Sequence, residues 1–88
     1  MVTSQVEIAS VIERFVRKQF RIDETVPSLC DAHLFESGFV DSAGVVELIA
    51  FLESTFTIRL DDDQVFSEDF TTINGIAAIV EKTASAPR

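Results

Sequence analysis

Apolar residues recur with the period of an α-helix in three stretches of the chain, and this spacing limits it to a helical fold. In the first stretch, positions i, i+3, i+4 and i+7 are Ile8, Val11, Ile12 and Phe15. Such a pattern buries one side of a helix and leaves the other side to polar residues. A chain of 88 residues forms one small core. We therefore expect a single all-α domain over residues 1–88, with a first helix at about 4–20.

Residues 21–41 follow without a sustained apolar period. They include Pro27 and Gly38, which are helix breakers and turn formers. A loop of this length is unusual in so small a domain and tends to be functional. We expect it to be held across the helices by its apolar residues, which are Val26, Leu29, Leu34, Phe35, Phe39 and Val40.

The second helix is expected at about 42–56. Its core side would consist of Val45, Leu48, Ile49, Leu52 and Phe56. The opposite side would consist of Ala43, Val46, Glu47, Ala50, Glu53 and Ser54. A single exposed valine at Val46 is ordinary on a protein surface. The alternative interpretation is a docking strip with a shallow apolar centre and acidic flanks.

A short third helix is predicted at about 61–66, because Asp61 and Gln64 have the spacing of a capping box. We expect Val65 and Phe66 to be its buried residues. Three consecutive aspartates also raise the question of calcium. An EF-hand loop needs a glycine at its sixth position and a glutamate at its twelfth, and the sequence has neither, so no metal site is expected.

A last helix is predicted at about 72–83, capped by Thr71 or Thr72, with a frayed tail at 84–88. Gly75 lies inside it and is expected to permit close packing. The predicted fold is thus a small four-helix bundle, with three main helices and one short helix.

The charge of the chain is strongly negative and unevenly placed. The formal net charge is −8, and residues 22–81 contain thirteen acids and one base, Arg59. Nucleic acid is therefore excluded as an expected partner. A basic protein surface is the natural complement, although the acids could also serve solubility alone. We expect no membrane association, since no apolar run approaches the roughly 20 residues of a span. One cysteine and no signal peptide predict a cytoplasmic protein.

Ser42 places a hydroxyl directly after Asp41 at the start of the second helix, which is a position suited to a phosphate group. A hydrolase would need a base and an oxyanion hole. The only histidine is His33, and the sequence around Ser42 has no Gly-x-Ser-x-Gly elbow. Cys30 has no convincing activating partner. We therefore predict that the chain is not an enzyme and has no catalytic residues.

The run from Leu34 to Ser42, with Val45-Val46-Glu47-Leu48 after it, resembles the acyl carrier and peptidyl carrier protein family. The resemblance covers the chain from the first helix to Val80. It implies that Ser42 carries 4'-phosphopantetheine, whose thiol holds an acyl or aminoacyl group as a thioester. It also implies that Asp41 lies beside the magnesium of the modifying transferase. The face implied to recognise partners consists of Ala43, Val46, Glu47, Ala50 and Glu53.

The resemblance implies several partners: a phosphopantetheinyl transferase, an adenylating acyl or amino acid ligase, and a downstream transferase, dehydrogenase or synthase. The Gly-Phe-Val-Asp-Ser spelling is similar to free-standing aminoacyl and D-alanyl carriers. We therefore expect a monomeric carrier in a secondary-metabolite or aminoacyl-transfer pathway. A fatty-acid-type carrier and an unmodified acidic interaction module remain as alternatives.

The sequence departs from the family pattern at three positions on the second helix. Ala43 stands where the family usually has leucine. Gly44 and Ser54 stand where fatty-acid carriers often have acids. These changes predict a smaller apolar contact and a less acidic recognition face than in typical fatty-acid carriers.

Overall fold

The computed structural model describes residues 4–26 and 29–85, and every regular element in this part of the chain is helical. The elements are α1 (Gln5–Gln19), η1 (Leu29–Asp31), α2 (Ser42–Phe56), α3 (Asp62–Val65), η2 (Glu68–Thr71) and α4 (Ile73–Ser85). Here η denotes a short 3-10 helix. The predicted all-α class, with three main helices and one short one, is confirmed.

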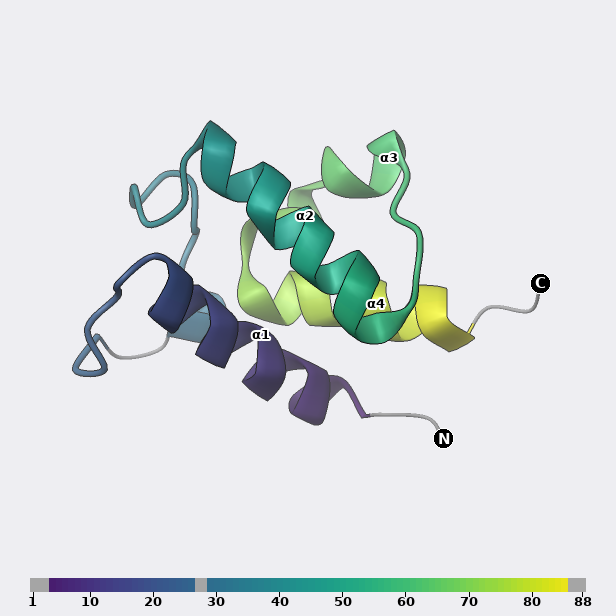
Figure 1. Ribbon diagram of the computed structural model, residues 1–88, viewed down its shortest axis with the longest axis horizontal. Coiled ribbons are helices and arrows are strands. Elements are labelled where there is room, and N and C mark those ends of the chain that lie inside the picture. Colours follow the sequence, from purple (N-terminus) through teal and green to yellow (C-terminus); the bar gives the residue numbers. More distant parts are fainter. Residues whose placement is uncertain (1–3, 27–28, 86–88) are drawn as a thin grey trace.

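The core lies between α1, α2 and α4. The most extensive helix contact is between α1 and α4. In Figure 1, α2 passes in front of α4, with α1 below it and α3 beside it. One apolar cluster joins all three long helices to the long connection. Its buried members are Ile8, Ala9, Ile12, Val16, Ile22, Leu29, Leu34, Val40, Leu48, Leu52, Phe70, Ile73, Ile76, Ala77, Ile79 and Val80.

Side-chain hydroxyls cap the starts of α1 and α4, and the cap of α4 is one of the two threonines that the sequence predicts. The Ser4 hydroxyl accepts a hydrogen bond of 3.3 Å from the amide of Glu7 at the start of α1. The Thr72 hydroxyl accepts one of 2.9 Å from the amide of Gly75 at the start of α4. Each of these bonds satisfies an amide that has no partner inside its helix.

Two predictions about the helix ends are wrong. The last helix, α4, continues through Ser85 rather than ending at about Thr83, so Ala84 is helical. The rest of the predicted tail, residues 86–88, lies outside the described residues. The predicted burial of Phe66 is also wrong, since its side chain is 84% exposed. A helix of one turn ends at Val65, and Phe66 is its C-cap, where helical periodicity no longer decides which way a side chain points.

The apolar residues of the long connection between α1 and α2 pack in or against the core, as predicted. Hydrogen bonds also tie the connection to other parts of the fold. Near α1, the Arg17 guanidinium donates to the carbonyl oxygens of Asp23 (2.7 Å) and Val26 (2.9 Å). Farther along, the amide of Leu34 donates to the carbonyl of Thr71, at 2.8 Å. These bonds hold the beginning and the middle of the connection against the rest of the fold.

Aromatic rings fill the space between α1 and α2. Phe15 stacks on Phe51 with ring centroids 3.9 Å apart, and Phe20 meets Phe15 edge to face at 6.3 Å. The Phe20 ring also covers Gly44, where an added Cβ would lie 2.6 Å from its Cε1 atom. The first turn of α2 is therefore packed against the end of α1.

Gly75 allows a close approach of α4 to the preceding turn, as the sequence predicts. A Cβ at this position would overlap the backbone carbonyl of Asp69 in η2. Because the obstacle is backbone rather than a flexible side chain, the two elements cannot stay this close with any larger residue at position 75.

We predict that Gly75→Ala destabilises the fold by about 1–3 kcal/mol, the usual range for overpacking. Without this overlap, alanine would stabilise the helix by about 1 kcal/mol relative to glycine. The sign of the change in unfolding free energy therefore shows whether overpacking or helix propensity dominates. Urea unfolding followed by circular dichroism measures it. Ser10→Ala, at an exposed position of α1, is the control and should be neutral or stabilising. A Gly75→Ala variant as stable as the parent would contradict the close approach.

Candidate functional site

Asp41 and Ser42 form a well-defined helix start. Asp41 has an extended backbone (φ −98°, ψ −175°), and its Oδ1 atom accepts a 2.8 Å hydrogen bond from the amide of Gly44. Its carbonyl accepts the first helical bond, from Val45, at 3.0 Å. Ser42 is therefore the first residue of α2, and its side chain is exposed.

This position suits a hydroxyl that carries an anionic group. Within the described residues, the amides of Ser42 and Ala43 have no hydrogen-bond acceptor. Free amides and the helix dipole together favour a negative charge at a helix N-terminus. A phosphate on the Ser42 hydroxyl would lie next to both.

A cavity of about 360 Å³ opens beside Ser42. Its walls come from three segments that are far apart in the sequence: the end of the long connection, the first turn of α2, and the region of α3 and η2. Besides Asp41 and Ser42, the lining residues are Phe35, Val40, Val45, Val65, Phe66 and Phe70. The space next to the hydroxyl is thus walled mainly by apolar side chains.

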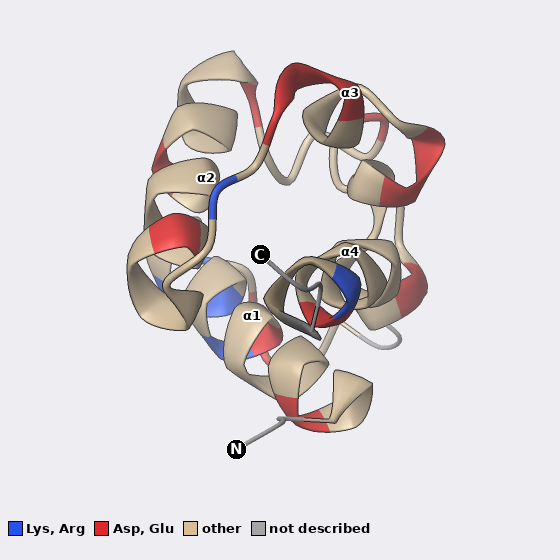
Figure 2. Cartoon of the chain, turned by 90° about the vertical axis from the view of Figure 1, so that its right-hand side faces the viewer, with Lys and Arg blue, Asp and Glu red and all other residues tan. Residues whose placement is uncertain are grey.

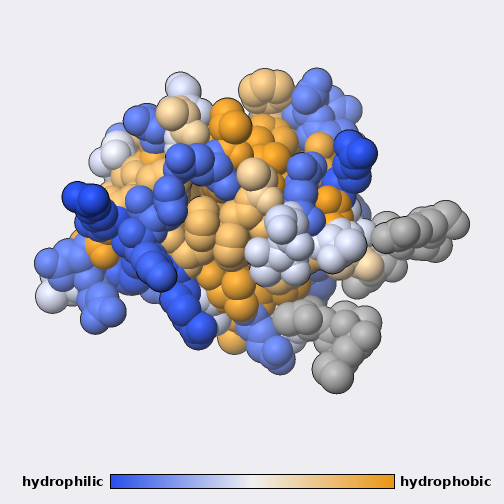
Figure 3. Space-filling view, viewed as in Figure 1, coloured by the Kyte–Doolittle hydropathy of each residue, from blue (hydrophilic) through white to orange (hydrophobic). Residues whose placement is uncertain are grey.

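The predicted recognition face lies along the outer side of α2. Ala43, Val46, Glu47 and Ala50 are exposed, and Val46 is 67% exposed. Figure 3 shows apolar surface across the middle of this side of the molecule, where α2 lies nearest the viewer, with hydrophilic groups at its left. The Glu47 carboxylate accepts a 2.9 Å hydrogen bond from Gln19 of α1.

Glu53 differs from the other four residues of that face. It is half-buried, and its Oε2 atom accepts a hydrogen bond of 2.9 Å from the amide of Leu60. Its carboxylate therefore stabilises the turn after α2. The strip that remains fully open to solvent is shorter than the sequence pattern indicates.

Gly44 is not part of the exposed face. This differs from the prediction, in which the absence of an acidic side chain at position 44 makes that face less acidic. It is buried beneath Phe20 and also close to Val40. An acidic side chain there would have to displace the Phe20 ring. The glycine is therefore explained by packing between α1 and α2.

Among the described residues, the only histidine is not part of the wall of the cavity beside Ser42. His33 accepts a 3.0 Å hydrogen bond at Nδ1 from the amide of Glu36, within its own turn. It lines a separate cavity of about 500 Å³ with Glu68, Asp69, Thr71 and Thr72. Neither the geometry nor the hydrogen bonding pairs it with the serine hydroxyl as a general base.

Cys30 is half-buried, and its thiol donates a 3.5 Å hydrogen bond to Oε1 of Glu13. Burial, followed by the carboxylate of Glu13, raises the pKa of the thiol from 9.0 to about 11. The same carboxylate forms an ion pair with Arg17 at 2.9 Å. The cysteine therefore stays protonated at neutral pH and is not an activated nucleophile.

Across residues 4–26 and 29–85, no group of three His, Cys, Asp or Glu side chains is arranged to hold a metal ion. At the start of α3, Asp61 instead forms a capping box with Gln64, in which each side chain bonds to the other's backbone, and Asp62 and Asp63 lie in the first turn. In the same part of the chain, no helix has both the length and the apolar character needed to cross a membrane.

Two residues of this region were missed by sequence reasoning. Phe66, predicted to be buried, lies on the wall of the Ser42 cavity, and Gln19 bonds to the recognition face from another helix. The capping box marks only where α3 begins, so it gave no signal that the helix ends before Phe66. The pairing of Gln19 with Glu47 had no signal in the sequence, because it depends on how α1 and α2 pack.

The domain is small and helical, and it presents an exposed serine at a helix start, capped by an aspartate and next to an apolar cavity. These are the features expected of a carrier protein. Residues 10–80 match the family model described as "Phosphopantetheine attachment site". The chain therefore belongs to the family of phosphopantetheine-binding carrier proteins. Members of this family carry a covalent 4'-phosphopantetheine group and transport substrates rather than convert them.

Several curated relatives are D-alanyl carrier proteins of Streptococcus pyogenes, among them those of serotype M5 (strain Manfredo), serotype M49 (strain NZ131) and serotype M1. Each is 39% identical over 77 residues, covering 88% of this chain and 94% of the relative. No solved structure matches the chain at a significant level.

The thiol of Cys30 provides a pH-dependent prediction. Raising its pKa from 9.0 to about 11 leaves about a hundredfold less thiolate at pH 8. We expect iodoacetamide to alkylate the folded protein correspondingly slowly, with a rate that keeps rising above pH 9. Glu13→Gln removes the nearby charge and should speed the reaction and lower the pKa. Alkylation of the folded chain as fast as of the urea-unfolded chain would contradict this environment.

Proposed function

We propose that Ser42 is the residue to which 4'-phosphopantetheine is attached. The observation that carries this proposal is the exposed hydroxyl at the start of α2, next to amides that have no acceptor in the described chain and to an open cavity. When bound, the group supplies a flexible arm ending in a thiol that holds cargo as a thioester. The cavity gives the inner part of such an arm an apolar surface to lie against.

Asp41 serves this site in two ways in our proposal. Its Oδ1 atom caps α2 through Gly44, which fixes the position of the neighbouring serine. Its side chain is otherwise exposed, so Oδ2 is free to face a magnesium ion held by the phosphopantetheinyl transferase. A carboxylate next to the phosphate-accepting hydroxyl is suited to such a shared cation.

We further propose that the cargo is an amino acid or a small acyl group, activated by an adenylating ligase and passed to a downstream transferase, dehydrogenase or synthase. The relatives named as D-alanyl carrier proteins support an amino acid cargo. Loading assays with D-alanine, other amino acids and fatty acids would distinguish these classes. We also propose a cytoplasmic, monomeric carrier. The single cysteine, which excludes an internal disulfide, supports the cytoplasmic location.

The attachment site is tested by incubating the purified chain with coenzyme A, magnesium and a broad-specificity phosphopantetheinyl transferase. Intact mass spectrometry should show the addition of one arm, and Ser42→Ala should abolish it. Ser37→Ala, at an exposed serine in the connection before α2, is the matched control and should load like the parent. A parent chain that gains no mass while the transferase modifies another carrier would disprove the proposal.

The recognition face is tested by Val46→Asp and Glu47→Lys. We expect each to reduce transfer of cargo from the adenylating ligase at least tenfold, because each changes the polarity or the charge that partners would meet. Far-ultraviolet circular dichroism should remain that of the parent. Val6→Asp is the matched control, since Val6 is 79% exposed but lies on α1. Normal transfer by both α2 variants would show that the face is wrongly assigned.

A further inference from the structure

Phe66 is an exposed aromatic side chain beside the candidate attachment serine. Its exposed fraction is 84%, the highest of the three large apolar residues found exposed in the described chain. A single exposed apolar residue is ordinary on a protein surface. What distinguishes Phe66 is its location, because it lines the same cavity as Ser42 and Val45.

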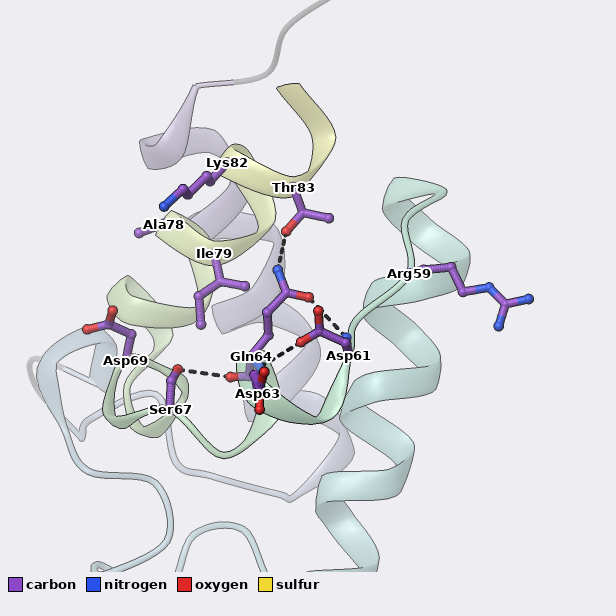
Figure 4. A pocket seen from close by; sticks show the side chains of 10 residues that line it. All are labelled: Arg59, Asp61, Asp63, Gln64, Ser67, Asp69, Ala78, Ile79, Lys82 and Thr83. Atoms are coloured by element: carbon purple, nitrogen blue, oxygen red, sulfur yellow. Dashed lines mark hydrogen bonds between the residues drawn. The ribbon is translucent and has the colours of Figure 1, made fainter. Parts of the chain in front are cut away.

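The segment that presents Phe66 is held firmly. The amide of Phe66 donates to the carbonyl of Asp62 at 2.9 Å, which closes the single turn of α3. Figure 4 shows the Gln64 side chain between the backbone of Asp61 and the Thr83 hydroxyl of α4, to which it donates at 2.7 Å. The Ser67 hydroxyl donates to the Gln64 carbonyl at 2.9 Å. An anchor fixed in this way loses little conformational entropy on binding.

The core does not need the Phe66 ring. Phe70, four residues later, is 1% exposed and fills the apolar space under this segment. On the α2 side of the cavity, the exposed apolar residues near Ser42 are small or medium in size, namely Ala43 and Val46. Phe66 is therefore the most exposed large apolar side chain among the residues that line the cavity beside Ser42.

The surroundings of Phe66 are acidic. Asp62 and Asp63 precede it, Glu68 and Asp69 follow it, and no lysine or arginine occurs between Leu60 and Glu81. Figure 2 shows several acidic segments in red in and around α3. A complementary surface would therefore be an apolar socket bordered by lysine and arginine side chains.

We propose that Phe66 is a docking anchor that inserts into such a socket on the phosphopantetheinyl transferase that acts at Ser42. The proposal rests on the attachment function proposed above. A transferase that reaches the Ser42 hydroxyl must cover the rim of the cavity, and Phe66 forms part of that rim. Buried aromatic anchors commonly provide much of the binding energy of an interface.

The test measures kcat/KM for arm transfer, with coenzyme A, magnesium and a broad-specificity phosphopantetheinyl transferase. Phe66→Ala should lower kcat/KM at least tenfold, mainly through a higher KM for the carrier, with an unchanged thermal midpoint. Phe66→Leu, which keeps an apolar side chain, should lose less. Val6→Ala is the control for removing an exposed apolar side chain and should load like the parent. Ala43→Leu in the Phe66→Ala background should recover part of the loss, because it restores a large apolar contact beside Ser42.

Parent kcat/KM in Phe66→Ala would overturn the proposal, and so would an equal loss in Val6→Ala. A dimer in sedimentation that disappears in Phe66→Ala would assign the ring to a second copy of the chain instead. These outcomes differ from failure of the proposed attachment function, in which the parent chain gains no arm at all; that result would overturn both proposals.

Discussion

The hydrogen bond from the amide of Leu34 to the carbonyl of Thr71 fixes the middle of the long connection onto the core. Ordering each residue of such a segment costs about 1–2 kcal/mol of conformational entropy, so it needs contacts of its own. Leu34 and Val40 supply them, since both are almost completely buried and the Val40 amide bonds back to the Leu34 carbonyl at 3.0 Å. The chain therefore reaches Asp41 from a fixed point, and the start of α2 is set by the core.

The long helices could be predicted because their apolar period extends over several turns. The cap residues Ser4, Asp41 and Asp61 could be predicted as well, since a cap needs only a side-chain oxygen at the right spacing. The exposure of Phe66 could not be predicted, because one turn of helix gives too short a pattern to orient the residue that follows it. Gly44 lies within a clear helical pattern, but its burial depends on the ring of Phe20 from another helix.

One part of the candidate site could also be predicted from neighbouring residues in the sequence. The serine hydroxyl and its aspartate cap are adjacent in sequence, so their geometry is local. The cavity beside them joins Phe35, Val45 and Phe70, which belong to three segments. Only the packing of α2 against the connection and the α3–η2 region brings these together. Likewise, the half-burial of Glu53 results from a turn whose path the sequence pattern did not indicate.

The close packing of Phe20 on Gly44 limits how the surface of this carrier can be redesigned. To change the protein surface that partners meet on α2, its solvent-facing residues would have to be replaced. Here positions 43, 46, 47 and 50 are open to such replacement, whereas position 44 is closed by the aromatic ring of α1. Any replacement that puts a side chain at position 44 must also replace Phe20, so the surface of α2 cannot be exchanged independently of the end of α1.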